Sequence, residues 1–331
     1  MIKAILLFIL GLVLLIKGGD WFVDGATKIA KRFNIPDLLI GATVVSIGTT
    51  LPEVMVSSAS AFSGHGQMAF GNAIGSIICN TALIAAITMA VKPAKVDKKT
   101  LTIPTVFFLM ASFVYFGVAY TTGNFTRPVG IILLVICGLY IIVNVRSALA
   151  NKGISGGADN EDTADEKDSP LWKNFVALLA GAAFIAVGAD LLVDNGIIIA
   201  EALGVPETVI AITFIALGTS LPELVTAITS LSKGHGSLSV GNICGANIFN
   251  LVLVSGASVT IGPFSLKDAG FATTTIGGHE IYKSLLVDSP LAIAVMLIML
   301  IPAIIKGELK RWQGVLLLCL YVGFCIYQFV G

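Results

Sequence analysis

The sequence has little charge. Of its 331 residues, 12% are Asp, Glu, Lys or Arg, while 56% are hydrophobic. Soluble domains carry about 25% charged residues. The apolar surface of this chain is too large for a soluble core of its size, whereas a lipid bilayer can accept it. The 20 basic and 20 acidic residues also balance, which leaves no excess positive charge for nucleic acid. The composition therefore excludes an ordinary soluble domain and indicates a membrane protein.

Cysteine and histidine are scarce, with five and three residues. The cysteines lie in apolar runs without the spacing of a zinc site or a disulfide framework, so we interpret them as small buried side chains. His65 and His235 lie in Gly-His-Gly segments that predict tight turns, and His279 is assigned no role. Without an H-E-x-x-H motif or a histidine inside an apolar run, an intramembrane metalloenzyme is disfavoured. We expect neither an enzyme nor a bound cofactor.

Ten stretches are long and apolar enough for transmembrane helices, which need about 20 residues. The sequence therefore predicts an all-α membrane protein with ten spans. The N-terminal stretch is interpreted as a span rather than a signal peptide, because no small-residue cleavage site follows it. The first and sixth spans can continue as helix through 18–32 and 195–202, and Pro52 and Pro222 are expected to interrupt the second and seventh. The expected ranges are 2–17, 35–62, 69–91, 100–120, 127–149, 172–194, 205–232, 238–261, 285–305 and 312–330.

The segment 151–170, between the fifth and sixth spans, is polar and rich in Asp and Glu. This composition predicts a solvated linker. A calcium-binding loop that starts at Asp159 is the alternative, but Ala164 and Pro170 stand where such a loop needs Gly and Glu. With the N-terminus outside, sixteen of the 20 basic residues lie in inside loops, the bias expected of cytoplasmic loops. Both termini are therefore expected outside and the linker in the cytoplasm.

The second half of the chain repeats the first at a constant offset. Between 41–80 and 211–250, 15 of 40 positions are identical. Gly-Thr-Thr-Leu-Pro-Glu, which ends at Glu53, matches Gly-Thr-Ser-Leu-Pro-Glu, which ends at Glu223, and each precedes a Gly-Asn-x-x-Gly segment. Five spans in each half is an odd number, so the second half enters the membrane from the opposite side. The sequence thus predicts two inverted five-helix repeats, 1–150 and 171–331, an architecture of secondary transporters with the ion site near the midplane. Only the second half carries the polar insertion 264–284.

Glu53 and Glu223 lie in the middle of apolar spans, where a charge costs about 2.5–3.5 kcal/mol or more. Spans two, three, seven and eight contain no Lys or Arg, so a bound cation is the natural compensation. The alternative is two protonated glutamates that bond to neighbouring asparagines. Asp20 and Asp24 can pair with Lys17 and Lys28, whereas their repeat mates, Asp190 and Asp194, have no adjacent lysine and are candidates for gating.

The residues around the two glutamates offer hard oxygen donors. Each proline lacks an N–H and frees a carbonyl about one turn earlier, near Ser46 and Ala216. Calcium takes 6–8 oxygen ligands, and sodium accepts a similar shell, whereas soft metals prefer sulfur or imidazole. Because Cys79 and Cys244 are not equivalent in the repeat, copper and zinc are disfavoured. The side-chain donors are Thr49, Thr50, Thr219, Ser220, Asn80 and Asn250, with Asn72, Asn242 and Asn247 as helpers.

At these motifs the chain resembles the cation/calcium exchanger superfamily, and within it the prokaryotic sodium/calcium exchangers. The resemblance covers essentially the whole chain. It implies a Ca²⁺/Na⁺ antiporter that exports calcium across a prokaryotic inner membrane by alternating access, with the first and sixth helices sliding over the rest. It implies a divalent site formed by Glu53, Glu223, Asn80 and Asn250. It further implies sodium sites lined by Thr49, Ser76, Thr219 and the carbonyls of Ser46 and Ala216, and shaped by Thr50 and Ser220.

Two positions depart from the family pattern and leave the counter-ion open. Some members carry Asp where Asn250 stands, and the repeat predicts a serine at Ala246 to match Ser76. A Ca²⁺/H⁺ antiporter on the same fold is therefore the alternative function, and a calcium channel is a further one. The expected partners are Ca²⁺, Na⁺ and the lipid bilayer, and no protein partner or nucleic acid is inferred.

Overall fold

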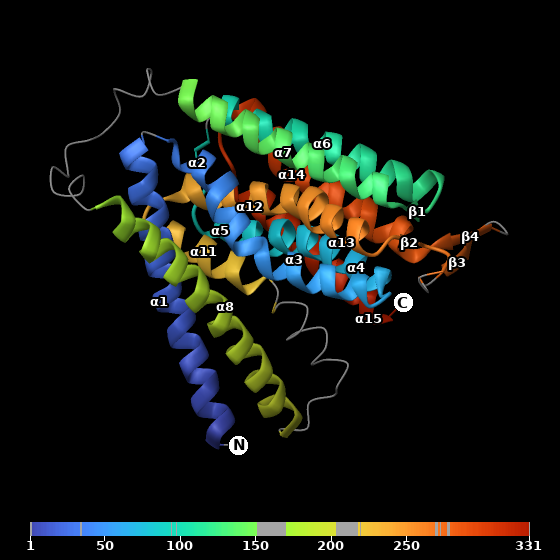
Figure 1. Cartoon of the computed structure of the whole chain (residues 1–331), viewed down its shortest axis with the longest axis horizontal. Helices are drawn as coiled ribbons and strands as arrows, with labels where there is room; N and C mark the ends of the chain where they lie inside the picture. The colour runs from blue at the N-terminus through green and yellow to red at the C-terminus, as the bar shows by residue number, and fades with distance from the viewer. Residues whose placement is uncertain are drawn as a thin grey trace. The chain divides into compact units, whose positions relative to one another are not determined.

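The computed structural model describes residues 2–33, 35–93, 95–96, 98–150, 170–202, 218, 220–268, 271, 273–276 and 279–330. These residues form helices with a few short strands (Figure 1). The helices group into two compact units, and each unit combines segments from both halves of the sequence. The first unit comprises Met1–Thr49 and Val145–Asn242, and the second comprises Thr50–Asn144 and Ile243–Gly331.

The expected membrane fold is confirmed, but the count of ten spans is not. Eight helices among the described residues are long and apolar enough to cross a membrane. Of the two other expected spans, 205–232 is described mainly as α11 (Leu221–Ser232), and 312–330 is α15 (Arg311–Val330), which opens on a charged residue. The expected linker lies outside the described residues except for Pro170. The eight candidate spans are Ile2–Phe33, Leu38–Phe62, Gly66–Val91, Leu101–Thr121, Arg127–Ser147, Leu171–Gly196, Gly236–Ile261 and Ser284–Lys306.

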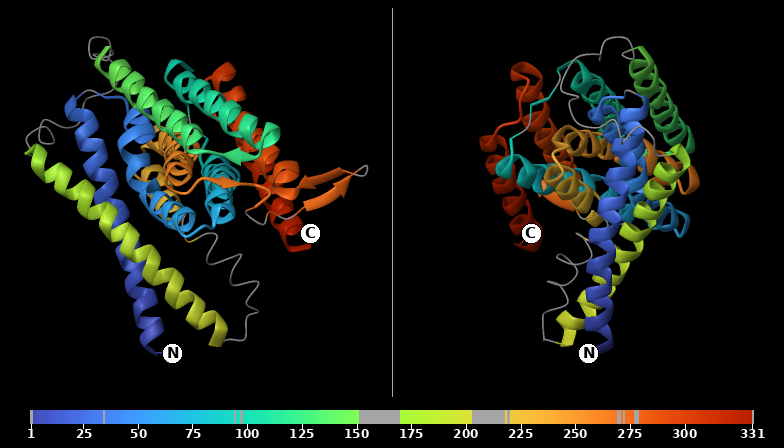
Figure 2. Two further views of the ribbon diagram at one scale, coloured as in Figure 1. Left: turned by 45° about the vertical axis from the view of Figure 1, so that its right-hand side comes forward. Right: turned by 90° about the vertical axis from the view of Figure 1, so that its left-hand side faces the viewer.

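In the first unit, two long helices lie side by side and antiparallel (Figures 1 and 2). They are α1 (Ile2–Phe33) and α8 (Leu171–Ala202), so the expected helical continuations of the first and sixth spans are confirmed. A Cβ atom on Gly18 would lie 2.9 Å from the carbonyl oxygen of Gly181, and one on Gly11 would lie 2.8 Å from that of Gly188. Such small residues let membrane helices approach closely, and here the two backbones are in direct contact.

Substitution by alanine should change the thermal midpoint differently at a glycine inside this contact and at a glycine outside it. Gly18→Ala should lower the thermal midpoint in detergent, because overpacking costs about 1–3 kcal/mol. Gly138→Ala, in α7 (Arg127–Ala150), is the control, since a Cβ there meets no atom within 4 Å. Alanine is the better helix former by up to about 1 kcal/mol, so the control should keep or raise the midpoint. Equal midpoints for both variants would contradict the close packing of α1 on α8.

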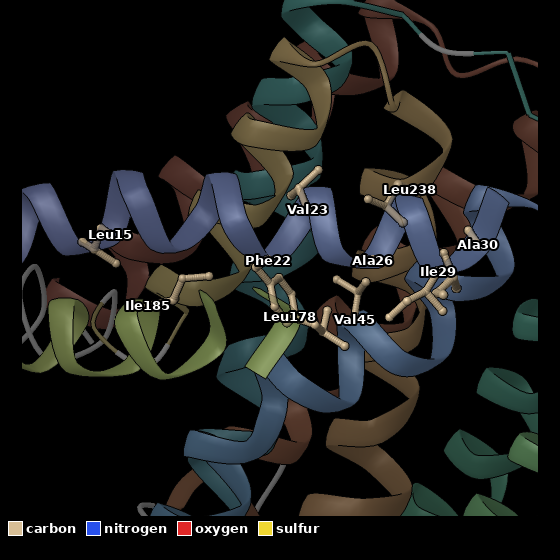
Figure 3. Close-up of a cluster of buried hydrophobic side chains, with 11 residues drawn as sticks. Leu15, Phe22, Val23, Ala26, Ile29, Ala30, Val45, Leu178, Ile185 and Leu238 are labelled. Atoms are coloured by element: carbon tan, nitrogen blue, oxygen red, sulfur yellow. The ribbon is translucent and has the colours of Figure 1, made fainter. Parts of the chain in front are cut away.

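A hydrophobic cluster holds these helices to the start of the first glutamate motif (Figure 3). Phe22 of α1 is 1% exposed and lies near Leu178 and Ile185 of α8. Its ring also lies against the backbone of the motif, since a Cβ atom on Gly48 would be 3.1 Å from Cζ of Phe22. A larger residue at position 48 would therefore push the start of α3 (Ser46–Phe62) away from α1.

The second unit contains two composite helices with the same repeat-related bounds. Residues 66–91 form α4 (Gly66–Ile78), η2 (Cys79–Ala85) and α5 (Ala86–Val91). Residues 236–261 form α12 (Gly236–Phe249), whose first seven residues belong to the first unit, then η6 (Asn250–Val254) and α13 (Ser255–Ile261). In both composite helices the middle segment is a π-helix. The other helices of this unit are α6 (Lys98–Thr121), α7, η7 (Ser284–Asp288), α14 (Ser289–Lys306) and α15.

The insertion of the second half carries short strands and is fixed by aromatic contacts. Strand β1 (Asn124–Phe125) pairs antiparallel with β2 (Phe264–Ser265), and β3 (Thr273–Ile276) pairs with β4 (His279–Tyr282). Phe264 stacks on Phe125 with ring centroids 4.9 Å apart, and Phe271 meets the edge of Phe70 at 5.2 Å. These contacts anchor the insertion to the helices of the second unit.

The two Gly-His-Gly segments are tight turns, as predicted. Gly64 and Gly234 have φ angles of 83° and 84°, a left-handed conformation that favours glycine. The backbone N–H groups of His65 and His235 donate to the carbonyls of Ser60 and Ser230 at 2.8 Å. This pattern ends a helix by satisfying its last carbonyls, so the histidines follow the helix ends as part of the turns.

The expected interruption at Pro52 is wrong. Helix α3 runs through Pro52 without a break, and the irregular backbone lies before it in a π-helical segment, η1 (Gly41–Val45). Local π adjustment and neighbouring groups can satisfy the backbone around a membrane proline, so the helix need not end there. Pro222 lies in the first turn of α11, where the missing N–H removes no helical hydrogen bond.

Candidate functional site

Nine of the eleven residues predicted to bind ions lie in the described part of the chain, and each is at most 4% exposed. Ala216 and Thr219 lie outside the described residues. The first unit holds Ser46, Thr49, Ser220 and Glu223, and the second holds Thr50, Glu53, Ser76, Asn80 and Asn250.

In the first unit, the two repeated motifs meet at Thr49. Its hydroxyl lies 3.3 Å from the carbonyl oxygen of Ser46 and 3.3 Å from Oδ1 of Asn242, and it can donate to either. Gly241, which directly precedes Asn242, allows this contact. A Cβ atom on Gly241 would lie 2.1 Å from the carbonyl oxygen of Leu38, so only glycine lets the two backbone segments come this close. The Gly-Asn pair of the second motif thus brings an amide against the hydroxyl of the first.

Glu223 and its repeat mate sit differently on their helices. Glu223 lies in the first turn of α11, which is preceded by Ser220, whereas Glu53 lies inside α3. The partial positive charge at a helix N-terminus stabilises a carboxylate in the first turn. The Ser-x-x-Glu spacing also matches a capping box, but Ser220 makes no side-chain capping bond. Its hydroxyl is therefore not used as a helix cap.

The amides predicted as ligands lie on the π-helical segments of the second unit. Asn80 is the second residue of η2, and Asn250 is the first residue of η6. Such widened turns are often found at functional sites. Sequence reasoning missed both of them, because neither segment contains a proline or any other residue that marks a widened turn.

Several of these polar groups have no hydrogen-bond partner among the described residues. They are Oγ1 of Thr50, Oγ of Ser220, and both amide atoms of Asn80 and of Asn250. A buried polar group without a partner costs about 1–3 kcal/mol, and such groups are rare in native proteins. The unbonded oxygens among them are hydroxyl and amide oxygens, which are donors that a hard cation accepts, and the second unit alone holds those of Thr50, Asn80 and Asn250.

One polar contact near Glu53 was not anticipated. Nδ2 of Asn72 donates to Oγ of Ser57 at 2.8 Å, which ties α4 to α3 one turn after Glu53. The spacing of Ser57 four residues after Glu53 is the signal that could have indicated it. Asn72, predicted as a helper ligand, thus has a structural partner.

The expected local ion pairs of Asp20 and Asp24 are replaced by a long-range pair. Nζ of Lys233 lies 3.2 Å from Asp20 and 2.8 Å from Asp24. Helix α11 packs against α1 in the first unit, so the lysine that follows α11 reaches both carboxylates. Asp190 and Asp194, the repeat mates, are exposed on α8, and their gating role remains a prediction.

Soft-metal sites gain no support from the described residues, in which no three His, Cys, Asp or Glu side chains gather into a metal-binding group. Cys79 and Cys244 are both buried. The donors that the described part offers are instead carboxylate, amide and hydroxyl oxygens.

Comparison with known proteins agrees with this chemistry. The sequence matches the sodium/calcium exchanger protein family over residues 3–146 and 173–330. It is 31% identical to the sodium/calcium exchanger MaX1 of Methanosarcina acetivorans, with 98% of each chain covered. It is 32% identical to the uncharacterized membrane protein MJ0091 of Methanocaldococcus jannaschii, with 95% of this chain and 94% of the relative covered. A solved structure of the sodium-calcium exchanger NCX_Mj superposes with a TM-score of 0.77 at 30% identity and covers 97% of both chains. The protein therefore belongs to the sodium/calcium exchanger family.

Proposed function

We propose that this protein is a secondary antiporter that exchanges Ca²⁺ for Na⁺ by alternating access and exports calcium. The observation that carries the proposal is that Glu53 and Glu223, which end the repeated motifs, are fully buried. Oxygen donors surround them in sequence, and two proteins that match over nearly the whole chain, MaX1 and NCX_Mj, are named as sodium/calcium exchangers. Calcium flux in proteoliposomes under an imposed sodium gradient tests it.

The proposed calcium ligands are the two carboxylates, with Asn80 and Asn250. Thr49, Ser76, Thr219 and the carbonyls of Ser46 and Ala216 are proposed to bind sodium, with Thr50 and Ser220 shaping those sites. Support comes from the burial of the described members and from the unbonded amides on η2 and η6. Ala246, which is fully buried, offers no hydroxyl to match Ser76, so one sodium site would have a ligand fewer than its repeat mate.

The proposed mechanism is competition for two negative charges. Glu53 and Glu223 can be neutralised by one calcium ion or by sodium ions. A neutralised site costs little to move through a low-dielectric interior, while an empty charged one costs several kcal/mol. The loaded protein would therefore change conformation readily and the empty one slowly, which gives exchange rather than leak. This reasoning disfavours a calcium channel.

We also propose the finer architecture of ten spans in two inverted repeats, 1–150 and 171–331. The helix contact in the first unit supports it. Gly11 contacts Gly188, and Gly18 contacts Gly181. The repeat aligns Gly11 with Gly181 and Gly18 with Gly188. If each residue is replaced by its repeat mate, the pair Gly11–Gly188 therefore becomes the pair Gly181–Gly18. An inverted repeat requires this symmetry: two antiparallel helices whose contacts are the same when the two halves of the sequence are interchanged.

The proposed location is a prokaryotic inner membrane, with both termini outside and the linker 151–170 in the cytoplasm. In a variant without native cysteines, Lys267→Cys should react with an impermeant thiol reagent added to intact cells. Lys92→Cys should react only after the cells are opened. Both lysines are exposed, so accessibility across the membrane decides the result. The reverse labelling pattern would overturn the orientation but leave the ion site unaffected.

A Ca²⁺/H⁺ antiporter on the same fold is the second candidate. The missing hydroxyl at Ala246 favours weaker sodium binding than a fully symmetric site would give, and an amide at Asn250 leaves the site with fewer ionisable oxygens than a family member with Asp there. The same flux experiment distinguishes the two functions when the sodium gradient is replaced by a pH gradient.

A further inference from the structure

Asn247 belongs to a buried polar cluster in the second unit that the proposed ligand set does not use. Its Nδ2 donates to Oγ1 of Thr81 at 2.7 Å and contacts Sδ of Met296 at 3.0 Å. The Thr81 hydroxyl in turn donates to the same sulfur at 3.3 Å. The three side chains come from α12, η2 and α14, and each is 0% exposed.

These contacts fix which way the Asn247 amide faces. A thioether sulfur can accept a hydrogen bond but cannot donate one. Thr81 uses its single hydroxyl hydrogen on that sulfur, so it can only accept from Asn247. Both neighbours therefore require the nitrogen end of the amide. The oxygen end, Oδ1, must point away from them, and it has no hydrogen-bond partner among the described residues.

Asn247 lies close to two of the proposed calcium ligands, Asn250 along its own helix and Asn80 through Thr81. Asn247 precedes Asn250 by three residues, and residues at this spacing share a helix face at about 5–6 Å between Cβ atoms. Its amide contacts Thr81, which directly follows Asn80. The repeat mate of Asn247 is Ile77, so the first half offers no such oxygen.

We propose that Asn247 is an additional ligand of the transported calcium ion through Oδ1, and that Thr81 and Met296 are positioning residues that hold its amide in the binding orientation. This rests on the proposed function and deepens it. A neutral amide oxygen suits a calcium shell, which takes 6–8 oxygens. A fixed orientation also avoids the entropy cost of ordering the side chain when the ion binds.

The test uses the full chain in proteoliposomes and measures the calcium concentration for half-maximal sodium-driven flux. The rise in thermal midpoint with added calcium, measured in detergent, reports binding without transport. Asn247→Ala should raise the half-maximal concentration roughly fivefold and reduce the calcium-induced rise. Asn144→Ala is the matched control. Asn144 is also a buried amide in the second unit with an unbonded Oδ1, but its Nδ2 donates to the carbonyl of Tyr140 on its own helix. The control should leave both readouts unchanged.

Met296→Leu separates positioning from packing. It nearly conserves volume, which cores tolerate well, yet it removes the acceptor that orients the amide. We expect a smaller rise in the half-maximal concentration than for Asn247→Ala, and no further rise when the two changes are combined, because Met296 acts through Asn247.

Three results would overturn the inference. The first is a half-maximal calcium concentration for Asn247→Ala that equals that of Asn144→Ala. The second is a double variant, Asn247→Ala with Met296→Leu, whose effect is the full sum of the two single effects. If Asn247→Ala does not fold, unchanged calcium dependence in Met296→Leu is the third. Failure of the proposed function would look different, because the unmodified protein would then lack sodium-driven flux while calcium-induced stabilisation still reports Asn247.

Discussion

Glu53→Gln and Glu223→Gln should each abolish sodium-driven calcium flux while the protein stays folded. Both side chains are 0% exposed, and the proposed mechanism needs their two charges. Removing one member of a buried charge pair costs about 2–5 kcal/mol in binding, which at 3 kcal/mol is over about 100-fold in affinity. Folding should not suffer, because glutamine keeps the shape and removes the cost of burying a charge. Flux at saturating calcium and the thermal midpoint are the two measurements.

Glu308→Gln is the matched control for these variants. Glu308 lies between α14 and α15, and Oε1 is 2.9 Å from Nζ of Lys310. The nearby ammonium lowers the pKa of Glu308, so this carboxylate is charged at neutral pH, as the transport mechanism requires of the other two. Its loss should leave flux unchanged. Near-normal flux in Glu53→Gln or Glu223→Gln would show that the substituted glutamate is not a principal ligand.

The second large effect is expected from Asn80→Leu and Asn250→Leu, which should impair transport and raise stability together. Neither amide has a hydrogen-bond partner among the described residues, and both side chains are 0% exposed. Replacing an unsatisfied polar group by an apolar one of similar shape removes a desolvation cost of about 1–3 kcal/mol. The same change removes an oxygen from a site that needs 6–8 of them for calcium. We therefore expect a higher thermal midpoint and at least a roughly tenfold higher half-maximal calcium concentration.

The two measurements are informative together because stability is expected to rise while calcium binding weakens. A structural asparagine would lose stability when replaced, with any loss of transport following from poorer folding. A lower midpoint with normal calcium dependence would assign Asn80 and Asn250 to packing rather than to the ion site. Because the repeat aligns Asn80 with Asn250, and each lies at or next to the start of its π-helical segment, similar results are expected for both.

Repetition and local helix chemistry are the features that the sequence predicted well. The constant offset of the repeat anticipated matching turns at Gly64 and Gly234, which have nearly equal φ angles. The long helices α1 and α8 were also anticipated, because residues 18–32 and 195–202 can continue the first and sixth spans as helix. Such features depend on residues that are neighbours in the chain, and a single sequence contains that information.

Features that depend on packing were not predicted. The irregular backbone expected at Pro52 lies earlier in the chain, in η1. No residue type in η2 or η6 indicates a π-helix. Asp20 and Asp24 pair with Lys233, which lies in the other half of the sequence, rather than with adjacent lysines. The Asn247–Thr81–Met296 contacts join three helices. In each case the partner is set by which helices lie together, which local spacing does not encode.

The most direct test of the central claim is calcium flux in proteoliposomes that contain only the purified protein. With calcium inside and sodium outside, an inward sodium gradient should drive saturable calcium efflux. Replacing sodium with potassium or choline, with or without a pH gradient, should abolish this efflux. Calcium movement that ignores sodium and follows the pH gradient would contradict the sodium assignment and favour proton exchange. Non-saturable movement without any counter-ion would contradict the antiporter itself.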